Sequence, residues 1–281
     1  MKKGDFFTVF KKFLLFILFI GIIAAGVFIL RENPEDQLKK IVYPSEFRVM
    51  TYNIHHGVGT DGLYSLSRIV RIIRDYAPHI VCLNEVDCKT ERTYNDDQAR
   101  ILAAELGMEF TFARNLALQG GWYGNAILSK YPIHFAENKI FSKSDSDEPR
   151  SVLHAILSVH EKKLHVYCTH LSVDSVNSAG EMKELINHVL DWGLDEPLII
   201  AGDLNVTPDS KTINDLTYYF NDLGSLSKVE SMTYPAGEPV KRIDYILMND
   251  KLKPLSIQTV SNDISRVASD HLPVFARFQF K

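Results

Sequence analysis

Apolar runs that adjoin short polar motifs are the feature that most constrains this chain. The apolar residues 198–201 lead directly into Gly202-Asp203-Leu204-Asn205, and Ser269-Asp270-His271 precedes a second apolar run at 272–276. Such runs predict buried strands. The polar side chains then lie at strand ends, where the edge of a sheet opens into a cleft. Carboxylate, amide and imidazole groups in such a place indicate metal-assisted phosphoester chemistry.

The rest of the chain alternates between strand and helix periodicities. The 281 residues are 46% hydrophobic, which is enough for one large domain with a buried core. Ser178 and Glu181 are spaced as a capping box at the start of a helix that Gly193 can end. Strands are expected at 47–54, 80–83, 110–113, 125–129, 152–159, 164–169, 198–201, 243–248 and 274–280. Helices are expected at 65–76 and 96–106, and a third helix is expected to end at 193. These patterns predict a layered α/β domain but not its strand order.

The N-terminus combines basic and apolar residues as a membrane segment does. Four lysines in the first 12 residues precede an uncharged stretch at 13–30, whose 18 residues span about 27 Å as a helix. We expect residues 1–30 to be an uncleaved signal-anchor, a single transmembrane helix with the catalytic domain outside the cytoplasmic membrane. A cleaved signal peptide is the alternative, because Ala24-Ala25-Gly26 offers small residues, although its apolar region is usually shorter.

The remaining residues divide into a linker and one domain. Residues 31–46 are charged and contain Pro34 and Pro44, which favours a linker, and 47–281 form the expected catalytic domain. Residues 1–30 carry a net charge of +3 and the whole chain −4, which leaves −7 on the rest. An acidic domain gains little from counterion release, so no general nucleic-acid binding is expected. A monomeric catalytic domain is the expectation.

Eight polar residues lie at the ends of predicted strands. Oxygen-rich ligands suit a hard divalent cation such as Mg²⁺, whereas zinc would need more clustered His or Cys. An Asp bonded to one ring nitrogen of a histidine fixes its tautomer and raises its pKa, and Asp244 could do this for His271. The eight residues are Asn53, Glu85, His170, Asp203, Asn205, Asp244, Asp270 and His271.

With these residues in their motifs, the chain resembles the endonuclease/exonuclease/phosphatase superfamily. The resemblance runs from about Phe47 to Phe280 and rests on seven motifs in the right order, any one of which would be weak alone. The fold it implies is a four-layer sandwich of two packed mixed β-sheets flanked by helices. The motifs are Thr51-Tyr52-Asn53-Ile54, Leu83-Asn84-Glu85-Val86, Gly124-Asn125-Ala126-Ile127-Leu128-Ser129, Thr169-His170-Leu171, Gly202-Asp203-Leu204-Asn205, Ile243-Asp244-Tyr245-Ile246 and Ser269-Asp270-His271.

The resemblance also implies a role for each motif residue. Glu85, helped by Asn53 and Asp270, would ligate Mg²⁺, with Mn²⁺ as a substitute. Asp203 would orient or deprotonate the attacking water, and Asn205 would hold a phosphate oxygen or a second metal. The remaining catalytic residues are His170 and His271, which would contact the scissile phosphate, and Asp244, which would orient His271.

Three further residues are candidates for substrate binding. Arg150 precedes a predicted strand and is placed to clamp a phosphate, although a solvated Arg fits equally well. Asn125 is either a substrate contact or a turn-shaping structural residue. His55, followed by His56, stands where abasic-site endonucleases tend to carry Asp, so both histidines are expected to line the cleft. A further departure from the family is Asn84, where a glutamine is common.

These observations favour a membrane-anchored, Mg²⁺-dependent phosphodiesterase acting outside the cytoplasmic membrane, with phospholipid head groups as a candidate substrate. The alternatives are a nuclease that cleaves DNA or RNA, a phosphomonoesterase of the inositol-phosphate type, and an inactive module that only binds a phosphate ligand. The family sets substrate choice by loops around a shared centre, so the motifs do not name the substrate.

Overall fold

The computed structural model describes residues 46–142, 148–227 and 232–281. Both sheets lie in one unit, Ser45–Lys281. The expected anchor at 1–30 lies outside the described residues, as does the expected linker at 31–46 except for Glu46, which begins the first strand. Among the described helices, none combines the length and apolar character needed to cross a bilayer.

Two six-stranded mixed sheets form the centre of this unit. Each sheet has one parallel pair of neighbouring strands, β1 with β2 in the first sheet and β7 with β8 in the second. All other neighbouring strands are antiparallel. The first sheet has the order β11 (Leu252–Thr259), β12 (Val274–Phe280), β1 (Glu46–Asn53), β2 (Ile80–Cys88), β4 (Gly121–Ser129), β3 (Glu109–Leu118). The second has the order β5 (Ile133–Ile140), β6 (Ser151–Val159), β7 (Lys162–His170), β8 (Leu198–Asp203), β10 (Asp244–Met248), β9 (Asn221–Asp222).

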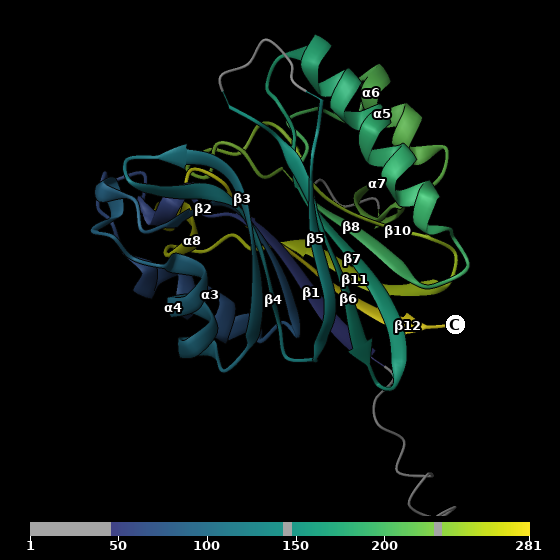
Figure 1. The fold of residues 1–281 in the computed structure, drawn as a ribbon, viewed down its shortest axis with the longest axis horizontal. Helices are drawn as coiled ribbons and strands as arrows, with labels where there is room; N and C mark the ends of the chain where they lie inside the picture. The colour runs from purple at the N-terminus through teal and green to yellow at the C-terminus, as the bar shows by residue number, and fades with distance from the viewer. Residues whose placement is uncertain (1–45, 143–147, 228–231) are drawn as a thin grey trace, which may run out of the picture. The chain divides into compact units, whose positions relative to one another are not determined.

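Helices cover the outer face of each sheet, so the expected four-layer sandwich is confirmed. Figure 1 shows α3 (Leu66–Tyr76) and α4 (Gln98–Leu106) on one side of the sheets, and α5 (Ser175–Trp192) and α6 (Lys211–Thr217) on the other. Separate apolar clusters fill the three interfaces between these layers. The short elements are η1 (His55–Gly57), η2 (Glu91–Thr93), α7 (Leu223–Ser227) and α8 (Ser265–Ala268).

The start of α5 differs from the expected capping box. The helix begins at Ser175, and the carboxylate of Asp174 caps it by accepting bonds from the backbone N–H groups of residues 176 and 177. Ser178 therefore lies inside the helix. Glu181 accepts bonds from the backbone N–H and hydroxyl of Ser172 instead, at 2.7 and 2.5 Å. Glu181 thus ties α5 to the loop after β7, which lines the cleft described below.

Strand register brings the polar motif residues together. His170, Asp203 and Asp244 are direct neighbours on β7, β8 and β10. In the other sheet, Asn53 of β1 lies beside Asn84 of β2. Because both groups stand at strand ends, the two sheets present their polar residues to the same opening.

Asn84 links the two sheets beneath this opening. It is fully buried, and its Oδ1 accepts a bond from the backbone N–H of Asp203 at 3.0 Å. Its Nδ2 donates to the carbonyl of Thr169 and to Oδ1 of Asn125, each at 2.9 Å. The amide thus fixes the end of β8, and with it the backbone of Asp203, against β2.

Gly202, next to Asp203, provides a test of this packing. Its φ is +146°, and a Cβ at this position would lie 1.8 Å from the carbonyl oxygen of Thr169 on β7. Gly202→Ala is therefore expected to destabilise the protein by about 3 kcal/mol or more, since β8 would have to separate from β7. Gly180→Ala in α5 is the matched control, because its added methyl group meets no heavy atom within 4 Å apart from its chain neighbours and the backbone of its own helix. The control is expected to gain about 0.5–1 kcal/mol in urea unfolding.

Candidate active site

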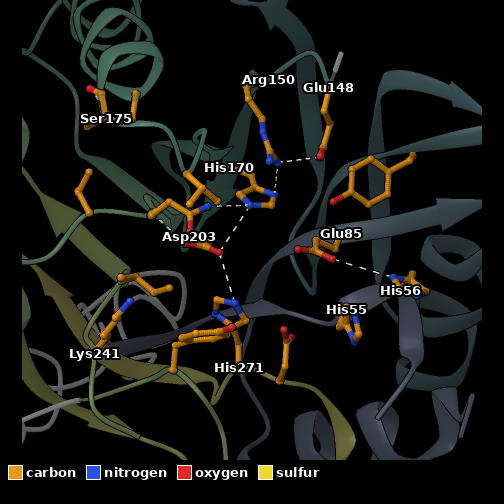
Figure 2. Close-up of a pocket in the computed structure, with 18 of the residues that line it drawn as sticks. His55, His56, Glu85, Glu148, Arg150, His170, Ser175, Asp203, Lys241 and His271 are labelled. Carbon is orange, nitrogen blue, oxygen red and sulfur yellow. Dashed lines mark hydrogen bonds and ion pairs between the residues drawn. The ribbon is translucent and has the colours of Figure 1, made fainter. Parts of the chain in front are cut away.

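A cleft of about 830 Å³ opens where the strand ends of the two sheets meet. Figure 2 shows Asp203, His170 and His271 on one side of it and Glu85, His55 and His56 on another. Its volume lies within the range of small-molecule sites. Most of the predicted site residues line this cleft, namely His55, Glu85, Arg150, His170, Asp203, Asn205, Asp270 and His271.

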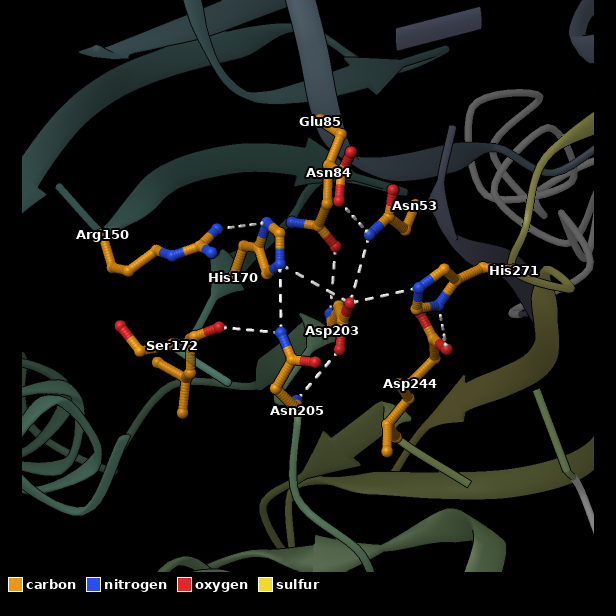
Figure 3. A network of polar contacts seen from close by, with 12 residues as sticks. Asn53, Asn84, Glu85, Arg150, His170, Ser172, Asp203, Asn205, Asp244 and His271 are labelled. Carbon is orange, nitrogen blue, oxygen red and sulfur yellow. Dashed lines mark hydrogen bonds and ion pairs between the residues drawn. The ribbon is translucent and has the colours of Figure 1, made fainter. Parts of the chain in front are cut away.

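Asp203 lies at the centre of the polar network. Its Oδ2 accepts a bond from Nδ2 of Asn53 at 3.1 Å and lies 3.5 and 3.6 Å from Nε2 of His170 and His271 (Figure 3). Its Oδ1 accepts a bond from the backbone N–H of Asn205 at 2.9 Å. Burial, together with the charge of Asp244 on the next strand, raises the pKa of Asp203 to about 7. A carboxylate with this pKa is suited to accept a proton near neutral pH.

Asp244 and His271 form a buried pair beside Asp203. Oδ2 of Asp244 lies 2.9 Å from Nδ1 of His271, so the carboxylate fixes a proton on Nδ1. Burial lowers the pKa of His271, but the charges of Asp244, Asp203 and Asp270 and the bond to Asp244 outweigh it and raise this pKa to about 10. His271 is therefore charged at neutral pH, and its Nε2–H is available as a donor.

His170 is held in the opposite, neutral state by Arg150. Nη1 of Arg150 lies 2.8 Å from Nδ1 of His170. Because a guanidinium only donates, Nδ1 must accept, and the single ring proton lies on Nε2. Burial, the Arg150 charge and the His271 charge hold the pKa of His170 well below its usual range. The site thus offers two Nε2–H groups, one from a charged and one from a neutral imidazole.

Glu85 reaches the cleft through an irregularity in β2. The register with β4 shifts between Leu83 and Val86, and Glu85 has a φ of +57°. A bulge of this kind changes the direction in which a side chain points. Consequently Asn84 stays between the sheets while Glu85 turns into the cleft, where its Oε1 accepts a bond from Nδ2 of Asn53 at 3.0 Å.

Asn53 was expected to be a metal ligand, but its contacts fit an orienting role. Its amide nitrogen faces the carboxylates of Glu85 and Asp203, and its Oδ1 accepts a bond from the backbone N–H of His55 at 3.1 Å. The nitrogen of an amide is a donor and not a metal ligand. Asn53 therefore fixes the positions of two carboxylates that belong to opposite sheets.

His55 and His56 lie beside Glu85 in strained backbone. Both have positive φ, 44° and 43°, and such conformations cluster at functional sites. Nδ1 of His55 lies 2.9 Å from the carbonyl of Val58, which can only accept, so the ring proton lies on Nδ1. His55 therefore offers the lone pair of Nε2, which suits a metal better than a phosphate oxygen. Potential ligand atoms of His55, His56 and Glu85 all lie within 4.8 Å of one another.

The acidic residues of the cleft fit a divalent cation. No Lys or Arg in the described ranges forms an ion pair with Glu85 or Asp270. Burial and the charge of Asp270 raise the pKa of Glu85, so the two carboxylates repel each other. A divalent cation would relieve this repulsion, and the adjacent nitrogen of His55 would extend the choice of metal from Mg²⁺ toward Mn²⁺.

Asn125 does not line the cleft. It is 1% exposed, on β4, and accepts the bond from Asn84 described above. The expected substrate contact is therefore replaced by a structural one, because the inward face of β4 points between the sheets. Sequence reasoning also did not select Lys241 and Tyr234, which line the cleft. Lys241 stands three residues before Asp244, and this proximity to a motif was the available signal.

Comparison with known proteins identifies the family. The model of the Endonuclease/Exonuclease/phosphatase family matches residues 50–271. The chain belongs to this family. Members of the Endonuclease/Exonuclease/phosphatase family are hydrolases of phosphoesters and typically depend on a divalent metal, which agrees with the acidic and histidine clusters of the cleft. The uncharacterized protein YbhP of Escherichia coli K12 is 31% identical to this chain over 169 residues. The match covers 57% of this chain and 66% of the length of YbhP, slightly less than two thirds.

Solved structures share the fold of the Endonuclease/Exonuclease/phosphatase family with this chain. An endonuclease/exonuclease/phosphatase from Beutenbergia cavernae has a TM-score of 0.68 and 23% identity, covering 84% of this chain and 72% of its own. The catalytic domain of human Nocturnin has a TM-score of 0.67 and 21% identity, with coverages of 84% and 94%. A mannosyl-6-phosphatase from Bacteroides thetaiotaomicron has a TM-score of 0.68 and 14% identity, with coverages of 83% and 100%.

Proposed function

We propose that this protein is a metal-dependent phosphodiesterase that acts outside the cytoplasmic membrane on small phosphodiesters, including phospholipid head groups. The observation that carries the proposal is the placement of one carboxylate, Asp203, between a charged and a neutral imidazole, in a cleft that Glu85 enters from the other sheet. A proton acceptor close to two donors is the arrangement that attack of water on phosphorus requires.

The side chains divide the work of the reaction. Asp203 orients the attacking water and accepts its proton, with a pKa near the operating pH. His271, charged and held by Asp244, donates Nε2–H to the oxygen on which negative charge develops. His170, fixed by Arg150, donates a second bond without adding charge. Asn53 maintains the spacing of Asp203 and Glu85.

Mg²⁺ fits this scheme through Glu85 and Asp270, with Mn²⁺ as a substitute. Bound there, the ion supplies positive charge that offsets the negative charge of the phosphoryl group. Asn205 remains the candidate for holding a phosphate oxygen, since it lines the cleft and its Nδ2, which donates one hydrogen to the carbonyl of Leu171 at 2.9 Å, has a second hydrogen to offer.

The walls of the cleft and the N-terminal sequence support the proposed substrate class. Lys241 supplies positive charge, and so does Arg150, whose charge is shared with Glu148 at 2.8 Å. Leu116, Leu118 and Val173 add apolar surface to the cleft. A cleft of this composition suits an anionic group that carries an apolar portion. The lysine-flanked apolar stretch at 13–30 would place it at a membrane surface. The net charge of −7 on the rest of the chain disfavours long nucleic acid as the substrate.

A substrate panel tests the proposal. The purified full chain, with Mg²⁺, is offered bis-p-nitrophenyl phosphate, p-nitrophenyl phosphate, phospholipid vesicles and duplex DNA. Hydrolysis of the diester and release of phospholipid head groups are expected to exceed cleavage of the monoester and of DNA. Faster cleavage of DNA with a steep salt dependence would replace the proposal by a nuclease, and faster cleavage of the monoester by a phosphatase. Phosphate binding without turnover of any substrate would indicate the inactive binding module.

A further inference from the structure

A second cluster of histidines lies on the helix-covered face of the second sheet, outside the cleft. Glu137 of β5 is the direct neighbour of His154 on β6, and His154 is the direct neighbour of Tyr167 on β7. His188 and Trp192 of α5, four residues apart, pack against them. None of the five lines the cleft. Their role is therefore independent of the reaction proposed above.

The spacing of the polar atoms is that of metal ligands. Oε1 of Glu137 lies 3.5 Å from Nδ1 of His154 and 3.4 Å from Nε2 of His188. Good N–H···O bonds are about 2.9–3.0 Å long, so both separations are long for hydrogen bonds. Two atoms that bind one tetrahedral metal at about 2.1 Å lie about 3.4 Å apart, which matches both distances. Potential ligand atoms of all three residues fall within 4.8 Å of one another.

Hydrogen bonds from neighbouring groups orient these atoms for binding a metal ion. Nε2 of His154 lies 3.2 Å from Nδ1 of His165. When His154 donates its single ring proton in this contact, its Nδ1 keeps a free lone pair that faces Glu137. Nε1–H of Trp192 donates to Oε1 of Glu137 at 2.9 Å. Outer hydrogen bonds of this kind fix the tautomer and orientation of metal ligands.

Besides the spacing of the atoms, the position of His188 indicates a bound metal ion. Its Nε2 is buried and has no hydrogen-bond partner, although it points toward Glu137. An unpaired buried polar atom destabilises the folded state, and a bound cation would remove this cost. His154 is held from the other side, since its ring stacks on Tyr167 with centroids 4.2 Å apart and planes at 11°.

We propose that Glu137, His154 and His188 form a structural site for a divalent transition cation of the zinc class. Two imidazole nitrogens and one carboxylate oxygen suit Zn²⁺ rather than Mg²⁺, which takes oxygen ligands and keeps several waters. The side chain of Glu137 is 38% exposed, so water has access for a fourth position. The bound ion joins edge strand β5 and β6 to α5. It thus stabilises the side of the domain where β5 has only one neighbouring strand.

Thermal unfolding with and without zinc tests the site. The full chain is stripped with a chelator, dialysed and melted with and without Zn²⁺. At about a hundredfold excess over Kd, Zn²⁺ is expected to raise Tm of the wild type by about 5 °C or more. His188→Gln and Glu137→Gln are expected to lose this rise and one equivalent of bound zinc. Both residues are partly exposed, so these variants are expected to fold.

Two control variants distinguish this site from other zinc-binding groups. His134→Gln replaces an exposed histidine on the same strand, and Glu85→Gln removes the carboxylate of the cleft. Both are expected to keep the zinc-dependent rise in Tm. The proposal is overturned if zinc does not stabilise the wild type, if His188→Gln and Glu137→Gln keep the full rise, or if Glu85→Gln alone abolishes it. Because the readout is Tm and not turnover, failure of the proposed enzymatic function leaves this test intact.

Discussion

Asp203→Asn is expected to lower kcat/KM for a phosphodiester by about 10³-fold at pH 7.5, with the fold retained. General-base catalysis contributes about 10²–10⁴-fold, and an amide cannot accept the proton of water. Asp203 is 1% exposed and lies at the centre of the network, with its Oδ2 within 3.6 Å of both catalytic imidazoles. The steady-state rate of p-nitrophenol release from the diester measures the effect, and circular dichroism confirms that the variant is folded.

Asp263→Asn is the matched control for this substitution. Asp263 is exposed and does not line the cleft, and its variant is expected to keep wild-type kcat/KM. A folded Asp203→Asn variant that kept more than about a tenth of the wild-type rate would contradict the role given to Asp203.

Asp244→Asn is expected to cost about 10²-fold in kcat/KM, although Asp244 does not line the cleft. It is a positioning residue that acts through His271, with a bond of 2.9 Å to Nδ1. Its charge is the main cause that raises the pKa of His271 against the effect of burial. Without it, the pKa of His271 falls, and the imidazole loses its proton at a lower pH. The alkaline limb of the kcat/KM profile should therefore move to lower pH.

A double-mutant cycle separates this role from a merely structural one. His271→Gln is expected to cost at least as much as Asp244→Asn, and the double variant no more than His271→Gln alone. Additive losses, or an Asp244→Asn profile whose alkaline limb stays in place, would show that Asp244 acts in some other way.

The sequence was most informative where a motif coincides with a strand end. Asp203, His170 and Asp244 were all placed at the ends of predicted strands, and strand register alone then makes them neighbours. The sequence left Asn125 open between a substrate contact and a structural residue, because one-residue alternation decides whether a strand side chain faces a cleft or the opposing sheet. The bulge that turns Glu85 into the cleft has no sequence signature, and neither has the tautomer of His55, which depends on the carbonyl of Val58.

The edge strands β5, β9 and β11 and the helix α6 were not predicted from the sequence, whereas the edge strand β3 was. β5 and β11 are mostly exposed or half-buried, so they lack the apolar runs by which the central strands were identified. The helix at α5 was predicted, but its start was not. Glu181 is recruited by Ser172, which lies outside the helix, and this tertiary contact replaces the local cap that the spacing suggested.

The dependence of phosphodiester hydrolysis on Mg²⁺, compared between the wild type and Glu85→Gln, tests the central claim most directly. Chelation is expected to abolish turnover by the wild type and Mg²⁺ to restore it, whereas folded Glu85→Gln should need at least about tenfold more Mg²⁺ or stay inactive. Glu105→Gln, an exposed glutamate on α4, should match the wild type. Turnover that survives chelation, or identical Mg²⁺ dependence in wild type and Glu85→Gln, would contradict a metal-dependent active site in this cleft.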